Sequence, residues 1–450
     1  MHELLNDAAA RAIRYLDGLD ARRVAPTPEA IATLKELDSP LPEAPTDPAA
    51  VLALLDDCGS PATVATAGPR FFGYVIGGSL PVSVAANWLA AAWDQPAFAY
   101  AISPVAATLE EIALRWLLDL FGLSSTCGGA FVTGATMANF CGLAAARHRL
   151  LNNAGWDVEA DGLFGAPPIK VIVGAEAHAS LFKALGMVGF GRQRVFTVPV
   201  DRQGRIRPDG LLAISGPAIV CLQAGNVNSG AFDPADEIIP RAHEAGAWLH
   251  VDGAFGLWAN ASPVHAHLLR GYADADSWAT DAHKWLNVPY DSGLAFVRDP
   301  EALCAAMATS AAYLPPPSER RDPAQFTPES SRRGRGIEVW AALRSLGRAG
   351  LADLIERTCR HAQRFAEGLR AAGYQVLNEI VINQILVSFG DEARTRRMIA
   401  AIQREGTCWC GPTVWQGQSA MRISISSWAT TGADVERSLA AMIRIAREQG

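Results

Sequence analysis

The chain lacks any long uninterrupted hydrophobic run. The apolar segment at residues 80–93 is interrupted by Pro81, Ser83 and Asn87 and is too short to cross a bilayer. The N-terminal segment MHELLNDAAARAIRYLDG carries Glu3 and Asp7 early and has no cationic start. We therefore expect an amphipathic helix there rather than a signal peptide, and a protein with no membrane partner.

The chain also has fewer positively than negatively charged residues. The 39 Lys and Arg residues against 46 Asp and Glu residues give a net charge of −7, which argues against a general nucleic-acid partner. The eight cysteines are scattered, and no Cys or His pair follows Cys408 and Cys410 at zinc-finger spacing. We expect no metal site, buried free thiols and a reducing, cytoplasmic location.

Apolar residues are plentiful and the chain is long. Half of the 450 residues are hydrophobic and 19% are charged, so the chain can bury a substantial core, which excludes a mainly disordered protein. At about 150 residues per domain, the length suggests about three lobes.

Composition shifts divide the chain into three parts. Residues 1–62 are helical and then proline-rich, which is typical of an arm that packs on another element. A second break at residues 314–336 combines prolines and charges, and loops of that length are often lids or linkers. We expect an N-terminal arm over 1–62, a large cofactor-binding domain over 63–335 and a smaller C-terminal α+β domain over 336–450.

Short apolar runs recur in the large domain, and each ends in small or polar residues. They cover residues 169–175, 218–225, 247–254, 276–285 and 293–297. Helical patterns separate several of them, so we predict an α/β fold with a mostly parallel sheet covered on both faces. Ligands of such sheets bind at the carboxyl ends of the strands.

Two of these strand ends carry charged residues. Lys284, in the sequence DAHKW, follows one run, and lysine is the side chain that forms Schiff bases with carbonyl cofactors. Asp252, in HVDGA, follows another and could pair with a cationic ring nitrogen. Taken singly, a surface lysine or a helix-capping aspartate explains each almost as well.

Two further strand ends add weaker signals. His178 follows residues 169–175 and could stack on an aromatic ring, although an ordinary core or surface histidine fits as well. Residues 134–139, GATMAN, open a helix with small side chains, and free N–H groups at a helix N-terminus bind phosphate. This turn is neither a Walker loop nor a dinucleotide-binding loop, and close packing alone could explain it.

Together these elements resemble the pyridoxal-phosphate-dependent group II amino-acid decarboxylases of the aspartate aminotransferase fold type I. The resemblance covers most of the chain, and its most specific part is HVD-x-A followed by HKW. The other motifs that carry it are residues 69–74, the turn with Ala138 and Asn139, Ala177-His178 with Lys183-Ala184, residues 228–234 and residues 421–424.

The resemblance implies a large domain with a mostly parallel seven-stranded sheet covered by helices, and a role for each candidate residue. Lys284 would carry the cofactor as a Schiff base, Asp252 would pair with its pyridine nitrogen, and His178 would stack on its ring and assist protonation. The phosphate would be held by Ala135, Thr136 and His283, with Asn226 or Asn228 nearby. The family further implies homodimers with active sites at the interface. The expected substrate-pocket residues are Phe72, Tyr74, Val75, Ile76, Phe98 and Phe326.

The sequence departs from the family pattern at several positions. The usual G-T-T-x-x-G stretch is GNVNSG at residues 225–230, and Met137 stands where an acidic residue is common. The segment before the arginine-rich residues has no tyrosine that aligns with the family's loop tyrosine; Phe326 is its aromatic residue, and Tyr313 lies earlier. Family members with phenylalanine at that position can form aldehydes.

The sequence leaves three functions open. We expect decarboxylation of an L-amino acid to its amine and CO₂, and the apolar residues 72–77 favour an aromatic or apolar side chain over an acidic one. The alternatives on the same cofactor are a carbon–carbon lyase and an oxidative deaminase that depends on decarboxylation. A fold relative without catalysis is the third possibility, and the presence of Lys284, Asp252 and His178 together argues against it.

Overall fold

The computed structural model describes residues 1–211, 214, 216–309 and 320–449. They form two compact units: one comprises residues 1–78, 363–377 and 385–450, and the other comprises residues 79–362 and 378–384. This division differs from the expected domain boundaries at residues 62 and 335, which stay predictions. Among the described residues, no helix is long and apolar enough to cross a membrane.

The larger unit is built on a seven-stranded sheet in the order β1-β7-β6-β5-β4-β2-β3. Only β7 runs against the others: it is antiparallel to both β1 and β6, and the pairs from β6 to β3 are all parallel. The carboxyl ends of the other six strands therefore meet at one edge. The strands are β1 (Gly128–Val132), β2 (Lys170–Gly174), β3 (Phe196–Val198), β4 (Ala218–Gln223), β5 (Trp248–Asp252), β6 (Ser277–Asp281) and β7 (Gly293–Val297).

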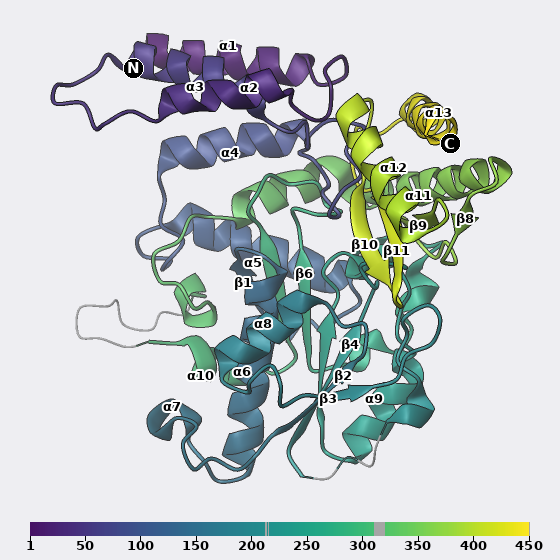
Figure 1. Ribbon diagram of the computed structural model, residues 1–450. Coiled ribbons are helices and arrows are strands. Elements are labelled where there is room, and N and C mark those ends of the chain that lie inside the picture. The colour runs from purple at the N-terminus through teal and green to yellow at the C-terminus, as the bar shows by residue number, and fades with distance from the viewer. Residues whose placement is uncertain (212–213, 215, 310–319, 450) are drawn as a thin grey trace. The chain divides into compact units, whose positions relative to one another are not determined.

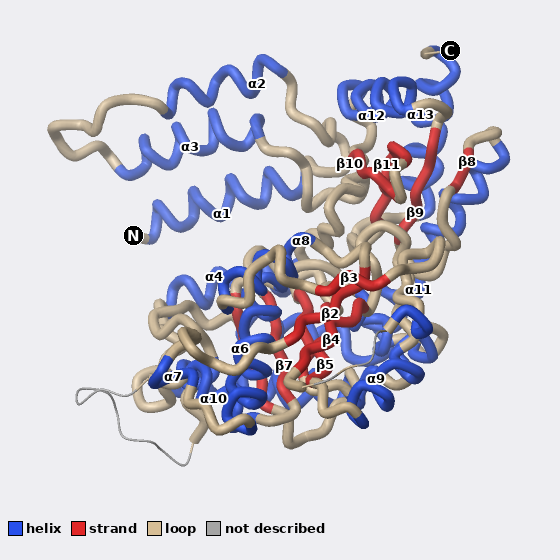
Figure 2. Tube along the Cα trace, turned by 60° about the horizontal axis from the view of Figure 1, so that its bottom comes forward, coloured by secondary structure: helices blue, strands red, loops and turns tan. Residues whose placement is uncertain are grey.

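Helices cover both faces of this sheet, as Figure 2 shows with α6 and α9 on opposite sides of the strands. Every residue of β1, β4, β5, β6 and β7 is buried, which is why their sequences are nearly continuous apolar runs. The helices of the unit are α4 (Pro81–Trp93), α5 (Pro104–Leu120), α6 (Ala135–Asn153), α7 (Val158–Asp161), α8 (Ala179–Val188), α9 (Ala235–Glu244), α10 (Pro300–Met307) and the part of α11 (Gly336–Ala371) up to Ala362. Short 3₁₀ helices add Pro208–Gly210, Gly256–Ala261, Ala266–Leu269, Tyr272–Asp274 and Pro323–Phe326.

The other unit contains the N-terminal helices and a four-stranded sheet in the order β10-β11-β9-β8. In the N-terminal part, α1 (His2–Asp17) and α2 (Pro28–Ala32) both pack on α3 (Pro48–Ala62) (Figure 1). Thr27 and Asp47 cap α2 and α3 at their N-termini, each just before a proline at the first helical position. The remaining elements are the 3₁₀ helix Thr33–Leu37, β8 (Gln375–Val376), β9 (Gln384–Ser388), α12 (Glu392–Glu405), β10 (Gly411–Trp415), β11 (Gln418–Ser424) and α13 (Gly432–Glu448).

Candidate active site

The candidate residues of the larger unit gather at the carboxyl edge of its sheet. The turn before Ala135 follows β1, His178 follows β2, Asn226 follows β4, Asp252 ends β5 and Lys284 follows β6. Since these strands run in the same sense, residues far apart in sequence meet at one edge.

Lys284 is tied to the turn at the start of α6 through Asp281. Its Nζ lies 2.9 Å from Oδ2 of Asp281, and the backbone N–H of Ala135 donates to Oδ1 of the same carboxylate at 2.6 Å. Asp281 is 2% exposed. We did not predict a role for this residue from the sequence, although its place three residues before Lys284 was a usable signal.

The turn at the start of α6 is packed tightly against β7. A Cβ added to Gly293 would lie 2.4 Å from Cα of Gly134, so only glycine allows this approach. Ala135 is buried in the first turn of α6, and Thr136 beside it is partly buried. The N-terminal end of this 19-residue helix presents N–H groups and the positive end of the helix dipole.

His283 lies next to this turn with a defined tautomer. The backbone N–H of Ser292 donates to its Nδ1 at 3.1 Å, so the ring proton resides on Nε2, which lies 3.7 Å from Oδ2 of Asp281. Burial lowers the pKa of His283, and the carboxylate of Asp281 acts in the opposite direction. The ring of Tyr290 lies against it, with 4.3 Å between the ring centroids.

Asp252 ends β5 with its carboxylate held by two donors. Oδ2 accepts a hydrogen bond from Nδ2 of Asn139 at 3.3 Å, and Oδ1 accepts one from the N–H of Ala254 at 3.3 Å. Asp252 is 4% exposed. A buried carboxylate held in one orientation is suited to pair with a protonated ring nitrogen.

His178 is placed at the N-terminus of α8 as its capping residue. Its Nδ1 accepts the backbone N–H of Ser180 at 3.2 Å and lies 2.7 Å from the Ser180 hydroxyl. The residue is exposed. This position fixes the ring at the sheet edge, and its stacking role stays a prediction.

Residues 225–230, GNVNSG, which differ from the family pattern, form a loop that is held by the side chain of Asn226. Its Oδ1 accepts the N–H groups of Asn228 and Ser229 at 2.9 and 3.2 Å, and its Nδ2 donates to the carbonyl of Glu176 at 3.2 Å. Asn226 therefore joins this loop to the segment that carries His178. Burial raises the pKa of Glu176.

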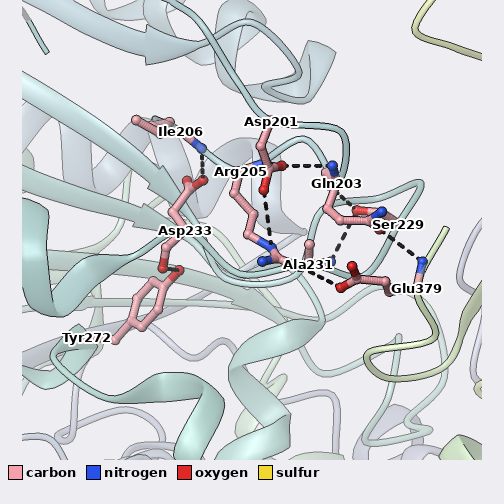
Figure 3. Close-up of polar contacts among 9 residues, drawn as sticks. All are labelled: Asp201, Gln203, Arg205, Ile206, Ser229, Ala231, Asp233, Tyr272 and Glu379. Carbon is pink, nitrogen blue, oxygen red and sulfur yellow. Dashed lines mark hydrogen bonds and ion pairs between the residues drawn. The ribbon is translucent and has the colours of Figure 1, made fainter. Parts of the chain in front are cut away.

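Asp233 lies three residues after this loop and bonds to Ile206 and Tyr272, as Figure 3 shows. Its carboxylate accepts the N–H groups of Ile206 and Gln223 at 2.7 and 2.6 Å, and its carbonyl accepts the Tyr272 hydroxyl at 2.9 Å. Burial raises the pKa of Asp233 to about 7, while the two N–H bonds lower it. These contacts make Asp233 a scaffold residue of the loop.

The aromatic segment near residue 72 belongs to the other unit. Phe72 packs edge-on against Phe365 with 5.2 Å between centroids, and the ring of Tyr74 stacks on Trp409 at 5.5 Å. Phe72 and Val75 are buried, whereas Tyr74 is 63% exposed. Ile76 is partly buried. That these four residues line the substrate pocket stays a prediction.

The other expected pocket residues, Phe98 and Phe326, lie on neighbouring segments. The N–H of Ala324 donates to the carbonyl of Phe98 at 3.0 Å. The Phe326 side chain packs against the core of the larger unit, with the Arg321 guanidinium 4.4 Å from its ring centroid. Phe326 is partly buried, and that Phe98 and Phe326 line the substrate pocket stays a prediction. Tyr313 lies outside the described residues.

Comparisons with known proteins identify the family. Residues 33–390 match the model of the pyridoxal-dependent decarboxylase conserved domain. The chain is 30% identical over 331 residues to acidic amino acid decarboxylase GADL1 of Mus musculus, which covers 70% of this chain and 59% of that protein. It is 27% identical over 384 residues to aromatic-L-amino-acid decarboxylase of Bacillus atrophaeus, which covers 82% of this chain and 77% of that protein.

A solved structure confirms the expected fold. The crystal structure of Oryza sativa TDC with PLP and tryptamine matches with a TM-score of 0.92 and 22% identity, over 99% of this chain and 97% of that one. The chain spans less than two thirds of the mouse relative's length, although the family match covers most of the chain itself. The chain therefore belongs to the family of pyridoxal-dependent decarboxylases, which are lyases that use pyridoxal phosphate.

Proposed function

We propose that this protein decarboxylates an L-amino acid with an aromatic or apolar side chain to the amine and CO₂. The observation that carries the proposal is the grouping at one sheet edge of Lys284, the N-terminus of α6 and the buried carboxylate of Asp252, with Asp281 bonded to the first two. A lysine, an anion-binding helix end and a carboxylate are the groups that pyridoxal phosphate requires.

The donor set at this edge fits the cofactor. We assign its phosphate to the first turn of α6, at Ala135 and Thr136, with the Nε2–H of His283 as a further donor. Asn226 and Asn228 would act from the adjacent loop, where their contacts hold the backbone in shape. Lys284 supplies the amine that reacts with the cofactor's aldehyde.

The reaction needs an electron acceptor and a group that moves protons. When bound, pyridoxal phosphate accepts the electron pair released as a bond to the substrate's α carbon breaks. Asp252 would keep a proton on the ring nitrogen by pairing with it, and His178 would orient the ring from the end of β2. Lys284 would hold the cofactor through its Nζ, and His178 would assist protonation.

Three of the arginines that could favour an acidic substrate pair with carboxylates of the protein. Arg70 is 2% exposed and pairs with Asp434 at 3.1 Å. Arg333 pairs with Glu338 at 2.7 Å, and Arg335 pairs with Asp291 at 2.8 Å. These contacts support an apolar or aromatic side chain on the substrate.

The alternatives on the same cofactor are a carbon–carbon lyase and an aldehyde-forming oxidative deaminase. A lyase for a phosphorylated base needs spare cationic groups, and in this segment Arg332 also pairs with a carboxylate, that of Glu110, at 2.6 Å. Phe326 has no proton to donate, which is why the aldehyde-forming reaction is kept as an alternative.

One experiment separates these reactions. The purified protein, loaded with pyridoxal phosphate, is incubated with individual L-amino acids while CO₂, ammonia and hydrogen peroxide are followed separately. We expect CO₂ and amine without ammonia. CO₂ together with ammonia and peroxide would establish the oxidative reaction, and turnover without CO₂ would refute decarboxylation.

We further propose a homodimer located in the cytoplasm. Large apolar side chains are exposed on α4, with Trp88, Leu89 and Trp93 at 44%, 53% and 43%, and such patches support a protein–protein contact. The cysteines are all free thiols, which fits a reducing compartment. Light scattering of the wild type and of Trp88→Glu tests the dimer: we expect twice the chain mass for the first and a smaller mass for the second.

A further inference from the structure

A chain of hydrogen bonds between buried polar groups connects Asp252 to residues that have no role in the proposed function. Asn139 donates to Asp252, and Oδ1 of Asn139 lies 2.9 Å from Nε2 of His250. Nδ1 of His250 lies 2.8 Å from the Ser277 hydroxyl, which accepts the indole N–H of Trp248 at 2.8 Å. None of these side chains is more than 8% exposed.

The direction of every hydrogen bond in this chain follows from its two ends. The Asp252 carboxylate can only accept and the Trp248 indole can only donate, so with a neutral His250 ring both ends are satisfied when Ser277 accepts the indole N–H and gives its own proton to Nδ1 of His250. The ring proton of His250 is then on Nε2 and is donated to Oδ1 of Asn139. The amide of Asn139 consequently presents its NH₂ group to Asp252, and a carboxylate can only accept.

The packing of α6 on β5 and β6 maintains this order. Trp248, His250 and Asp252 alternate along β5 and so point to one face. On α6, Gly142 lies three residues after Asn139, and a Cβ added to it would lie 2.8 Å from the His250 ring. Burial also lowers the pKa of His250 to about 3, so the ring stays neutral with one proton.

We propose that Trp248, Ser277 and His250 are positioning residues that fix the amide of Asn139 and, through it, the carboxylate of Asp252. The inference rests on the proposed role of Asp252 at the cofactor's ring nitrogen. If Ser277 no longer donates, the His250 ring proton can move to Nδ1, and the Asn139 amide can exchange the positions of its oxygen and its NH₂ group. The amide oxygen would then face the carboxylate of Asp252 and repel it.

Two substitutions test this arrangement against a matched control. Ser277→Ala removes the donor to His250, and Trp248→Phe removes the first donor of the chain. Trp278→Phe is the control, because Trp278 is also buried and donates its indole N–H to the carbonyl of Tyr272 at 2.8 Å, outside this series of hydrogen bonds. The measurements are pyridoxal phosphate affinity from absorbance titration, the pH dependence of the bound cofactor's visible spectrum, and kcat and KM.

We expect Ser277→Ala to bind pyridoxal phosphate roughly tenfold more weakly, with a shifted spectral pH profile and a lower kcat at similar KM. Trp248→Phe should change in the same direction by less, and Trp278→Phe should match the wild type. Wild-type affinity and pH profile in Ser277→Ala, or equal losses in both tryptophan variants, would overturn the proposal. A wild-type protein that neither binds the cofactor nor turns over amino acids would instead refute the proposed function.

Discussion

The carboxylate of Asp281 lies between Nζ of Lys284 and the backbone N–H of Ala135, at 2.9 and 2.6 Å. One buried side chain therefore joins the proposed reactive lysine to the proposed phosphate-binding turn. This contact makes the two halves of the candidate site depend on each other, and its removal should affect both.

Replacement of Asp281 should weaken the fold as well as the site. Asp281→Ala leaves the N–H of Ala135 without its acceptor and Lys284 without its ion pair, so we expect a loss of about 1–3 kcal/mol of unfolding free energy. Asp281→Asn retains an oxygen for Ala135 and should lose less. Urea denaturation of the cofactor-free proteins measures both; equal stability of Asp281→Ala and the wild type would show that the contact contributes nothing.

The close approach of β7 to the turn gives a second prediction. In Gly293→Ala, the new methyl would lie 2.4 Å from Cα of Gly134, so the turn must move. We expect about 1–3 kcal/mol of destabilisation and weaker cofactor binding. Gly59→Ala in α3 is the control, since nothing lies within 4 Å of its added Cβ and alanine favours a helix by about 0.5–1 kcal/mol. Unchanged cofactor affinity in Gly293→Ala would argue against a phosphate site at this turn.

His250 should make stability depend on pH. Burial lowers its pKa from 6.5 to about 3, so between these values the unfolded chain binds a proton that the folded chain excludes. The part of the unfolding free energy that depends on the neutral His250 ring is fully present above about pH 6.5 and is lost as the pH falls. The advantage of the wild type over His250→Gln should shrink by roughly 1.4 kcal/mol per pH unit below about pH 6.

Urea denaturation at pH 7.5, 6.0 and 5.0 measures this trend. His267→Gln is a suitable control because His267 is exposed, and its difference from the wild type should stay constant. A difference between the wild type and His250→Gln that does not vary with pH would mean that the ring is not held neutral.

The buried ion pair of Glu110 and Arg332 should fix the segment that precedes α11. Arg332 contacts both carboxylate oxygens of Glu110 at 2.6 and 2.7 Å, and Glu110 is completely buried. Arg332→Ala should cost about 3–5 kcal/mol, because it leaves a buried charge with weaker compensation. Arg348→Ala, which breaks an exposed pair with Asp119, should have little effect. Similar denaturation midpoints for both variants would contradict this assignment.

The sheet and the order of its site residues could be predicted because both depend on local pattern. The run at residues 218–225 became β4 (Ala218–Gln223), and the run at 293–297 is β7 itself. Strands buried on both faces are apolar throughout, and polar residues at their ends stand out. The strands β3, β8 and β10 were missed, since they lack such runs.

Contacts between distant segments could not be predicted in the same way. Nothing in the spacing of Asp281 and Ala135, 146 residues apart, indicates that they are bonded. The same holds for Asn139 and Asp252, which meet only because α6 packs on β5. Phe326 lies in a proline- and charge-rich segment, and its packing on the core and on Arg321 could not be read from the sequence either.

The most direct test is to identify the lysine that binds the cofactor. The chain contains only four lysines, Lys35, Lys170, Lys183 and Lys284, so borohydride reduction of the loaded protein followed by peptide mapping gives an unambiguous position. We predict that the reduced cofactor is attached to Lys284 and that Lys284→Ala neither retains it nor releases CO₂ from any amino acid. Attachment to another lysine, or CO₂ release by Lys284→Ala, would contradict the assignment.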